Sequence, residues 1–344
     1  MPYNRQPVGG RYGNKLTEIG MKRRDFVKNT TLTALGASLI APLESLADTP
    51  VTHIESEDLS ASNGIANGYP LNFMAIGDWG RNGEYNQVEV AKQMGNWGKA
   101  NPNNFIISVG DNIYPKGVVS EYDPAWHYSF ENVYTAHSLQ VDWFSVLGNH
   151  DYAADPDAQI RYSKISRRWN MPSRYYTKEV SLGEGKGKAL FVMIDTQPII
   201  YDIKDQQPEK QLAWINKTLK EASADVKWKI VVGHHPYYTA GPRIKNYDTL
   251  AIRKAMSKIF EENKVDIYLA GHDHSLQHLK PSGVTHQFIT GAGSELTPVT
   301  DGVQYSKFQA SENGFMYFSI SAEKIAVKVI NLKGDVLYGT TLSK

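Results

Sequence analysis

Residues 266–274 of the 344-residue chain read DIYLAGHDH, an apolar run that ends in a glycine and leads directly into two histidines. Apolar runs of this length, bounded by glycine, are typical of strands buried on both faces of a sheet. Glycine permits a sharp turn of the backbone, so the next side chain can point away from the strand end. The stretch therefore predicts a buried strand that delivers His272 and His274 to the edge of a sheet.

The same arrangement recurs four more times along the chain. Earlier apolar runs end at Gly77-Asp78, Gly110-Asp111, Gly148-Asn149 and Gly233-His234. Between them, residues 84–99, 208–222 and 249–263 carry apolar positions at helical spacing. Strands that alternate with helices in this way predict an α/β layered sheet.

The C-terminal part has a different pattern. Residues 316–320 and 325–330 alternate between apolar and polar, with Ser321-Ala322-Glu323-Lys324 between them, which predicts antiparallel hairpins. The sequence from 71 to 344 contains no Pro/Gly-rich linker, so we expect residues 71–344 to form a single domain.

Composition narrows the chemistry that the chain can perform. It contains 37 Lys+Arg, 36 Asp+Glu, ten His and no Cys, with a formal net charge of +1. Without cysteine there is no disulfide framework, thiolate metal site or cysteine nucleophile. The balanced charge gives no basis for a nucleic-acid groove or a polybasic membrane patch, so no nucleic-acid partner is expected.

The polar residues at the strand ends are best interpreted together. Taken singly, Gly-Asp is usually a turn or helix cap, and the histidines of 148–151 and 271–274 could be ordinary loop residues. Because functional groups of α/β sheets gather where strands end, the joint occurrence instead predicts one metal centre. Its candidate ligands are the oxygen and imidazole side chains Asp78, Asp111, Asn149, His234, His272 and His274.

This set of motifs resembles that of the calcineurin-like metallophosphoesterase superfamily. In the first motif, Gly77-Asp78-Trp79-Gly80, a glycine stands where that superfamily carries a histidine ligand. In the second motif, Tyr114 follows Asp111 by three residues. This exchange resembles the purple acid phosphatases, and the chain is most similar to their small, mammalian-like tartrate-resistant branch. The resemblance implies a four-layer α/β/β/α sandwich with mixed sheets.

The resemblance also implies a binuclear centre of Fe(III) and a divalent Fe, Zn or Mn ion. Phenolate and carboxylate are hard anionic donors and favour Fe(III). The implied activity is hydrolysis of phosphate monoesters by a metal-bound hydroxide. The implied ligands of the first ion are Asp78, Tyr114, His274 and a bridging Asp111, and those of the second are Asp111, Asn149, His234 and His272.

Several residues in and beside these motifs are candidates to act on the substrate or to support the ligands. The resemblance assigns phosphate binding and leaving-group protonation to His150, with Asp151 orienting it; a turn cap is the alternative for Asp151. Asn149 is expected to contact substrate as well as metal. His235 is expected to line the substrate pocket or to support a metal ligand. Arg243 either binds phosphate or is an exposed surface residue.

The first 47 residues predict export. Met21, the expected true start, is followed by Arg23-Arg24, an uncharged apolar run at 30–42 and small residues at 45–47. This order is typical of a secretory signal peptide and resembles the signals read by the twin-arginine export machinery. The apolar run is too short for a membrane anchor. A short buried amphipathic helix is the alternative interpretation.

Signal removal would leave a flexible, acid- and Ser-rich leader at 48–70 ahead of the domain. We therefore expect a periplasmic or secreted acid phosphatase that acts on small phosphate esters and has no stable membrane anchor. Two alternatives remain open at this stage. One is a phosphodiesterase or phospholipid-directed hydrolase with the same site. The other is a redox or phosphate-binding protein that uses the di-iron centre without hydrolysis.

Overall fold

The structure, a computed structural model, describes residues 69–344. The expected signal peptide at 1–47 and nearly all of the leader at 48–70 lie outside the described residues, so both stay predictions. The described residues all belong to one compact unit. Regular structure begins at Leu71, the residue at which the predicted domain starts.

The first of two seven-stranded mixed sheets combines a parallel half with an antiparallel half. The parallel strands are β1 (Leu71–Ile76), β2 (Phe105–Ser108), β3 (Asp142–Ser145) and β4 (Trp169–Asn170). The antiparallel strands are β12 (Gly314–Ile320), β13 (Lys324–Asn331) and β14 (Val336–Ser343), which continue the sheet beyond β1. The predicted C-terminal hairpins are therefore confirmed, and they extend the sheet that carries three of the predicted functional strands.

The second sheet is also mixed. Its parallel strands are β6 (Lys188–Met193), β7 (Val226–Val232), β8 (Ile267–Ala270) and β10 (His286–Thr290). Its antiparallel strands are β5 (Tyr176–Ser181), β9 (Leu276–Leu279) and β11 (Ser306–Ala310). Parallel strands buried on both faces account for the continuous apolar runs of β7 and β8.

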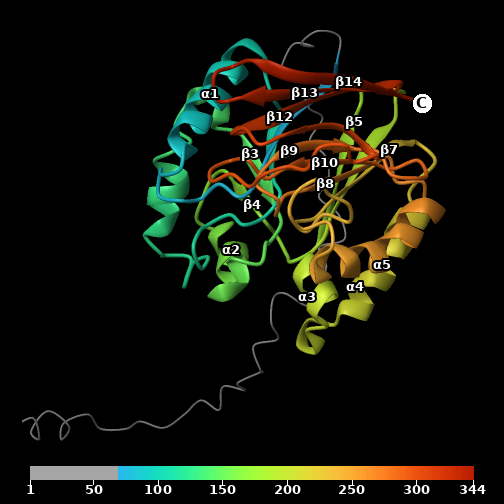
Figure 1. The fold of residues 1–344 in the computed structure, drawn as a ribbon, viewed down its shortest axis with the longest axis horizontal. Coiled ribbons are helices and arrows are strands. Elements are labelled where there is room, and N and C mark those ends of the chain that lie inside the picture. The colour runs from blue at the N-terminus through green and yellow to red at the C-terminus, as the bar shows by residue number, and fades with distance from the viewer. Residues whose placement is uncertain (1–68) are drawn as a thin grey trace, which may run out of the picture. The chain divides into compact units, whose positions relative to one another are not determined.

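Helices cover the outer faces of the stacked sheets, as Figure 1 shows, with α1 on one side and α3, α4 and α5 together on the other. These helices span Gln87–Ala100, Thr196–Tyr201, Pro208–Lys220 and Tyr247–Glu262, and α2 (Asp157–Tyr162) is a short helix after the third strand end. The three predicted helices agree with α1, α4 and α5 to within three residues at each end. The predicted sandwich of two mixed sheets between helices is confirmed.

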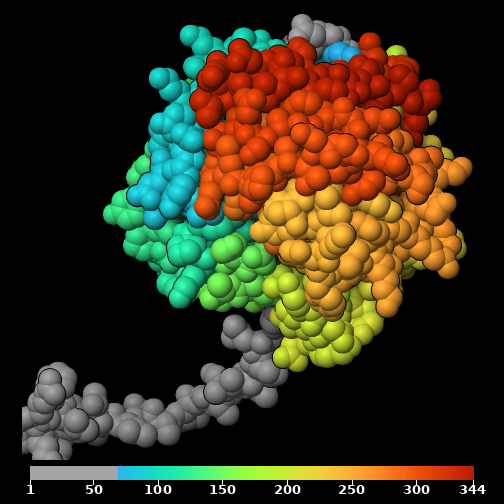
Figure 2. Space-filling view, in the orientation of Figure 1, coloured from blue at the N-terminus to red at the C-terminus, as the bar shows by residue number. Residues whose placement is uncertain are grey.

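An aromatic cluster joins the two sheets. Phe73 of β1 stacks on Phe318 and Phe105 with ring centroids 4.8 and 5.3 Å apart, and it meets Phe191 of β6 edge-on at 5.4 Å. Such pairs add directional contacts to the area that they bury. None of the helices within residues 69–344 is long and apolar enough to cross a membrane. Figure 2 shows α1 beside the C-terminal strands on the surface.

Candidate metal centre

The loops that follow the strands of the two sheets are joined to one another by backbone hydrogen bonds. In the first sheet, the Asp78 amide donates to the Gly110 carbonyl at 3.1 Å. In the second, the Gly271 amide donates to the His234 carbonyl at 2.9 Å. Gly77, which follows β1, donates to Thr290 of β10 at 2.8 Å and thereby connects the sheets. All the predicted ligands consequently lie at one end of the sandwich.

The backbone at these strand ends differs from expectation. The left-handed conformation is adopted by Asp78 (φ 57°), Asp111 (φ 48°) and His272 (φ 68°), whereas Gly110 (φ 92°) is the only one of the five strand-end glycines that adopts it. Gly148 instead provides space, because a Cβ there would overlap the Asp111 side chain and amide. Non-glycine residues held at positive φ cost free energy and concentrate at functional sites.

Tyr114 lies at the centre of the first ligand group. Its Oη atom is 2.8 Å from Asp111 Oδ2, 3.1 Å from Asp78 Oδ1 and 3.1 Å from His274 Nε2. His274 Nε2 is 3.3 Å from Asp78 Oδ1, so four predicted ligand atoms converge on one point. The structure thus brings together all the residues expected around the first ion.

The surroundings of Tyr114 hold its phenol in the protonated form until a metal ion binds. Burial, followed by the negative charges of Asp111 and Asp78, raises the pKa of Tyr114 well above its ordinary value. The guanidinium of Arg81 lies 3.8 Å above the ring and opposes this shift. A salt bridge to Glu295 at 2.7 Å holds Arg81 there. No motif in the sequence pointed to Arg81.

His234 links the second ligand group to Asp111. Its Nε2 atom lies 3.4 Å from Asp111 Oδ2 and 3.2 Å from Asn149 Oδ1. Its Nδ1 lies 2.9 Å from the Val109 carbonyl, which can only accept, so Nδ1 carries a proton and Nε2 is left for a metal. Burial lowers the pKa of His234, but the charges of Asp111 and Asp78 outweigh it and raise the pKa to about 9.

His272 is oriented by a residue that the sequence analysis missed. Its Nε2 donates to the Asp248 carboxylate of α5 at 2.7 Å, which leaves a lone pair on Nδ1. Its backbone amide donates to Asp78 Oδ2 at 3.0 Å. Burial, and then repulsion from His234, lowers the pKa of His272 well below the ordinary value. Asp248 lies near the start of a helix outside every motif, so only the folded chain reveals it.

His235 faces the same group. Its Nδ1 is 2.7 Å from Thr196 Oγ1, and its ring centroid is 4.4 Å from that of His272. Its buried Nε2 has no hydrogen-bond partner among the described residues. Nitrogen atoms of His234, His235 and His272 lie within 4.8 Å of one another, as do ligand atoms of Asp78, Asp111 and His234. Buried carboxylates beside inward-facing imidazoles fit a pair of metal ions.

His150 lies against the first ligand group, but its orienting partner is not the one expected. Its ring is 4.4 Å from that of Tyr114, and its Nδ1 donates to the Pro115 carbonyl at 2.7 Å. Asp151 is fully buried and accepts bonds from backbone amides, including Gly148 at 2.8 Å and Asn112 at 3.1 Å. The predicted contact between Asp151 and His150 is therefore replaced by a loop cap, the alternative reading of that residue.

Arg243 is neither free nor fully exposed. It donates to Asp273 Oδ1 at 2.7 Å, with a quarter of its side chain exposed. Trp79 is fully buried and donates to Ser108 Oγ at 2.8 Å, so it is a packing residue. The motif residues thus divide into side chains that converge on the centre and side chains that shape its loops.

Known proteins identify the family. The sequence pattern of calcineurin-like phosphoesterases matches residues 71–276. Purple acid phosphatase 4 of Arabidopsis thaliana is 38% identical over 299 residues, which cover 80% of this chain and 84% of that protein. The chain belongs to the purple acid phosphatase family. Tartrate-resistant acid phosphatase type 5 of Homo sapiens is 32% identical over 303 residues, which cover 80% of this chain and 91% of that protein.

Solved structures agree with this assignment. GAP50, the anchor in the inner membrane complex of Plasmodium, superimposes with a TM-score of 0.72 at 26% identity, covering 79% of this chain and 88% of that one. A purple acid phosphatase from yellow lupin seeds superimposes with a TM-score of 0.61 at 15% identity, covering 79% of this chain and 53% of that one, and it supports the fold alone. As a member of the purple acid phosphatase family, the chain is a metal-dependent phosphoesterase.

Proposed function

We propose that this purple acid phosphatase is an exported enzyme that hydrolyses small phosphate monoesters at a centre of Fe(III) and a divalent Fe, Zn or Mn ion. The observation that carries the proposal is the position of Tyr114, whose Oη lies 2.8 Å from the carboxylate of Asp111 and 3.1 Å from Asp78. A phenolate with two carboxylates is a hard, anionic donor set that suits a trivalent ion.

The two ligand groups share Asp111. We assign Asp78, Tyr114 and His274 to the first ion, and Asn149, His234 and His272 to the second, with Asp111 between them. The free Nε2 of His235 supports a place for this residue beside the second ion rather than on the substrate side. Metal binding would displace the Tyr114 proton and the Nε2 proton of His234, so metal affinity should rise with pH.

When bound, the ions supply an activated water and neutralise charge on the phosphate. The protein positions the groups around them. His150 is half-buried, and because its Nδ1 is held by Pro115, its Nε2 is the nitrogen that can carry a proton to the leaving alkoxide. Asn149 is half-buried in the same loop with its Oδ1 3.2 Å from His234 Nε2, and in this proposal it would contact both the second ion and the phosphate.

The colour of the purified enzyme tests the centre, because tyrosinate bound to Fe(III) absorbs visible light. We expect a violet protein that contains iron, and a Tyr114→Phe variant that folds but loses the visible band and most of its activity. Tyr134→Phe is the matched control, since Tyr134 is a buried tyrosine whose hydroxyl has no partner among the described residues. An active enzyme whose absorption is unchanged by Tyr114→Phe would remove Fe(III)–tyrosinate from the proposal.

The substrate class is tested with the same preparation. An aryl phosphate and its bis-ester are compared at acid and neutral pH, and we expect faster turnover of the monoester under acid conditions. Preference for the bis-ester would support the phosphodiesterase alternative. A fully loaded protein that hydrolyses neither ester would support the non-hydrolytic alternative.

The export part of the proposal rests on the sequence from Met21 to Ala47. A twin-arginine signal requires its arginine pair, so replacing Arg23 and Arg24 with lysine should retain the precursor inside the cell, while Lys15→Arg, outside the signal, should not. Cell fractionation and immunoblotting measure the distribution. Export that is unaffected by loss of both arginines would contradict this part of the proposal.

A further inference from the structure

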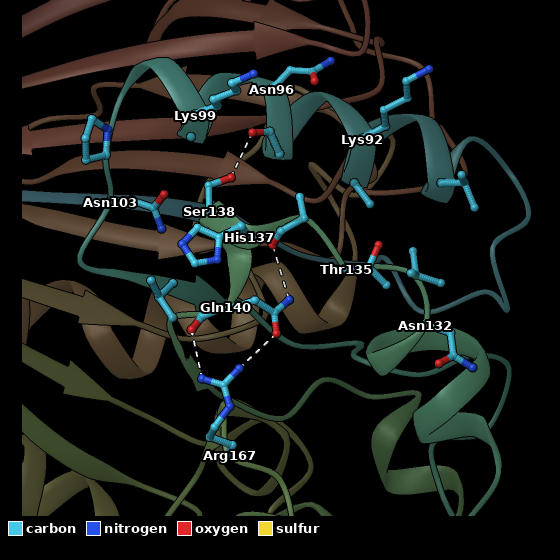
Figure 3. Close-up of a pocket in the computed structure, with 18 residues that line it drawn as sticks. Lys92, Asn96, Lys99, Asn103, Asn132, Thr135, His137, Ser138, Gln140 and Arg167 are labelled. Atoms are coloured by element: carbon cyan, nitrogen blue, oxygen red, sulfur yellow. Dashed lines mark hydrogen bonds between the residues drawn. The ribbon is translucent and has the colours of Figure 1, made fainter.

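A second cavity lies away from the metal centre, between α1 and the loop that precedes β3. Its volume is about 1080 Å³, and small residues of α1 form its floor where Gly95 approaches Ala136. Figure 3 shows Lys92, Asn96 and Lys99 along one flank of α1, with His137, Gln140 and Arg167 across the cavity. We refer to this cavity as the α1 cleft.

The α1 cleft is lined by basic residues and by no acidic ones. Lys92, Lys99, His137 and Arg167 line it, and no Asp or Glu does. Within residues 69–344, none of these four forms an ion pair with a carboxylate, and Arg167 donates instead to Gln140 Oε1 at 3.0 Å. An uncompensated positive surface of this kind attracts an anionic ligand.

Asn103 supplies an independent sign of an occupant. Its side chain is only 6% exposed, yet neither its Nδ2 nor its Oδ1 has a hydrogen-bond partner among the described residues. In Figure 3 its amide points toward His137 and Ser138. Because a buried amide left unpaired is costly, this one is suited to a group that both accepts and donates. A peptide bond has that property.

The spacing of the two lysines sets the length of the ligand. Lys92 and Lys99 are seven residues apart on one helix, which places their Cα atoms about 10 Å apart along its axis. In an extended peptide of the polyproline II type, with three residues per turn and a rise of about 3.1 Å per residue, side chains three residues apart share a face and lie about 9 Å apart. The cleft therefore matches an extended peptide that carries acidic side chains three residues apart.

The chain itself contains such a peptide, directly before the first described residue in the sequence. Residues 48–68 include Asp48, Glu55, Glu57 and Asp58 and no Lys or Arg. Glu55 and Asp58 are three residues apart. The segment joins the described fold at Tyr69. Three residues later, the backbone amide of Asn72 donates to Oδ1 of Asn104 at 2.9 Å, and Asn104 is the neighbour of Asn103. The ten residues 59–68 span at most about 36 Å, which is more than three times the spacing of Lys92 and Lys99 along α1.

We propose that the α1 cleft is a binding site for an extended acidic peptide and that its occupant is the segment 48–60 of this chain. The cleft adjoins the residues that lead into β2 and β3, whereas the metal ligands follow the opposite ends of those strands. The docked segment therefore contacts the base of the sandwich and leaves the metal centre open.

Lysine acylation in the full chain, read by peptide mapping, tests the docking. If the docked state is favoured over the undocked state by about four to one, about one fifth of the molecules expose Lys92 and Lys99 at any time. Acylation of these lysines should then be about fivefold slower than in a Glu55→Gln/Glu57→Gln/Asp58→Asn variant. Exposed Lys254 on α5 should react equally in both proteins. Salt at about 1 M should abolish the protection, because it screens exposed charges.

A charge-matched control removes the carboxylates of Asp202, Asp205 and Glu209, which are exposed near the start of α4, and should leave the protection intact. The reciprocal variant Lys92→Gln/Lys99→Gln should speed cleavage after Glu55 by a glutamyl endopeptidase about fivefold. Equal lysine reactivity in the parent and the triple variant would overturn the proposal. Protection that disappears on dilution would also overturn it, because the occupant would then be a second copy of the chain.

Discussion

Individual ligands of the centre are oriented by atoms that do not themselves bind metal. The Val109 carbonyl fixes the tautomer of His234, and Asp248 does the same for His272. The partners of metal-bound histidines control which nitrogen faces the ion and how strongly it binds. These partners come from a strand end and from α5, far from the histidines in sequence, so residue patterns alone did not reveal them.

His150 allows a test of proton donation at this scale. We expect His150→Ala to lower kcat for an alkyl phosphate by about 100-fold or more, because the departing alkoxide needs a proton. A nitrophenyl phosphate should lose much less, because its leaving group is stable as an anion. Metal content and the visible band should stay unchanged, as measured by elemental analysis and absorption.

Exposed His127 provides the control, and His127→Ala should behave as the parent enzyme does. Equal losses for the two substrates in His150→Ala would show that His150 binds phosphate without protonating the leaving group.

At the level of elements, two neighbouring strands make the folding stability depend on pH through a pair of histidines away from the candidate metal centre. His278 of β9 and His286 at the start of β10 share a 2.9 Å contact between Nε2 and Nδ1. Burial, and then repulsion from His286, lowers the pKa of His278 to about 3. Burial, and then Lys280, lowers the pKa of His286 to about 4. Both histidines are therefore held neutral by the fold.

The sign of the resulting pH effect follows from these values. In the unfolded chain both histidines titrate near 6.5, so below that pH the unfolded state binds more protons and stability falls until about pH 3–4. Each histidine contributes about 2 kcal/mol, so we expect the unfolding free energy of His278→Gln/His286→Gln to fall by about 4 kcal/mol less than that of the parent between pH 7 and pH 5. Urea denaturation at both pH values measures this difference.

The matched control replaces His127 and His137, two exposed histidines, and should keep the parent's pH dependence. An identical loss in the parent and the His278/His286 variant would show that the pair does not titrate as described.

At the level of the whole molecule, the centre draws ligands from both sheets. Asp78, Asp111 and Asn149 follow strands of the first sheet, while His234 and His272 follow strands of the second. Ions bound by these residues would therefore connect the two halves of the sandwich. Ligands that bind only the folded state stabilise it by mass action.

Removal of metal by chelation should accordingly lower the melting temperature. Free metal at a hundred times the dissociation constant of one site stabilises the fold by about 2.7 kcal/mol, which is about 4–5 °C for a protein of this size. Differential scanning calorimetry before and after dialysis against a chelator measures the shift. His234→Ala, which lacks a central ligand, should show a much smaller shift, and an equal shift in both proteins would exclude the metal centre as its cause.

Residue order alone predicted the sheet-and-helix pattern, the family and the side chains that meet at the candidate centre, because each apolar strand is followed directly by a polar candidate ligand. Tyr114 and His274 could be found in this way since they lie within short motifs. The partners of those side chains are visible only in the folded chain. Asp151 caps a loop, Pro115 orients His150, and Asp248 and Arg81 reach ligands far from them in sequence. Hydrogen bonds and charges act over a few ångströms, and that proximity is created by the packing of the two sheets.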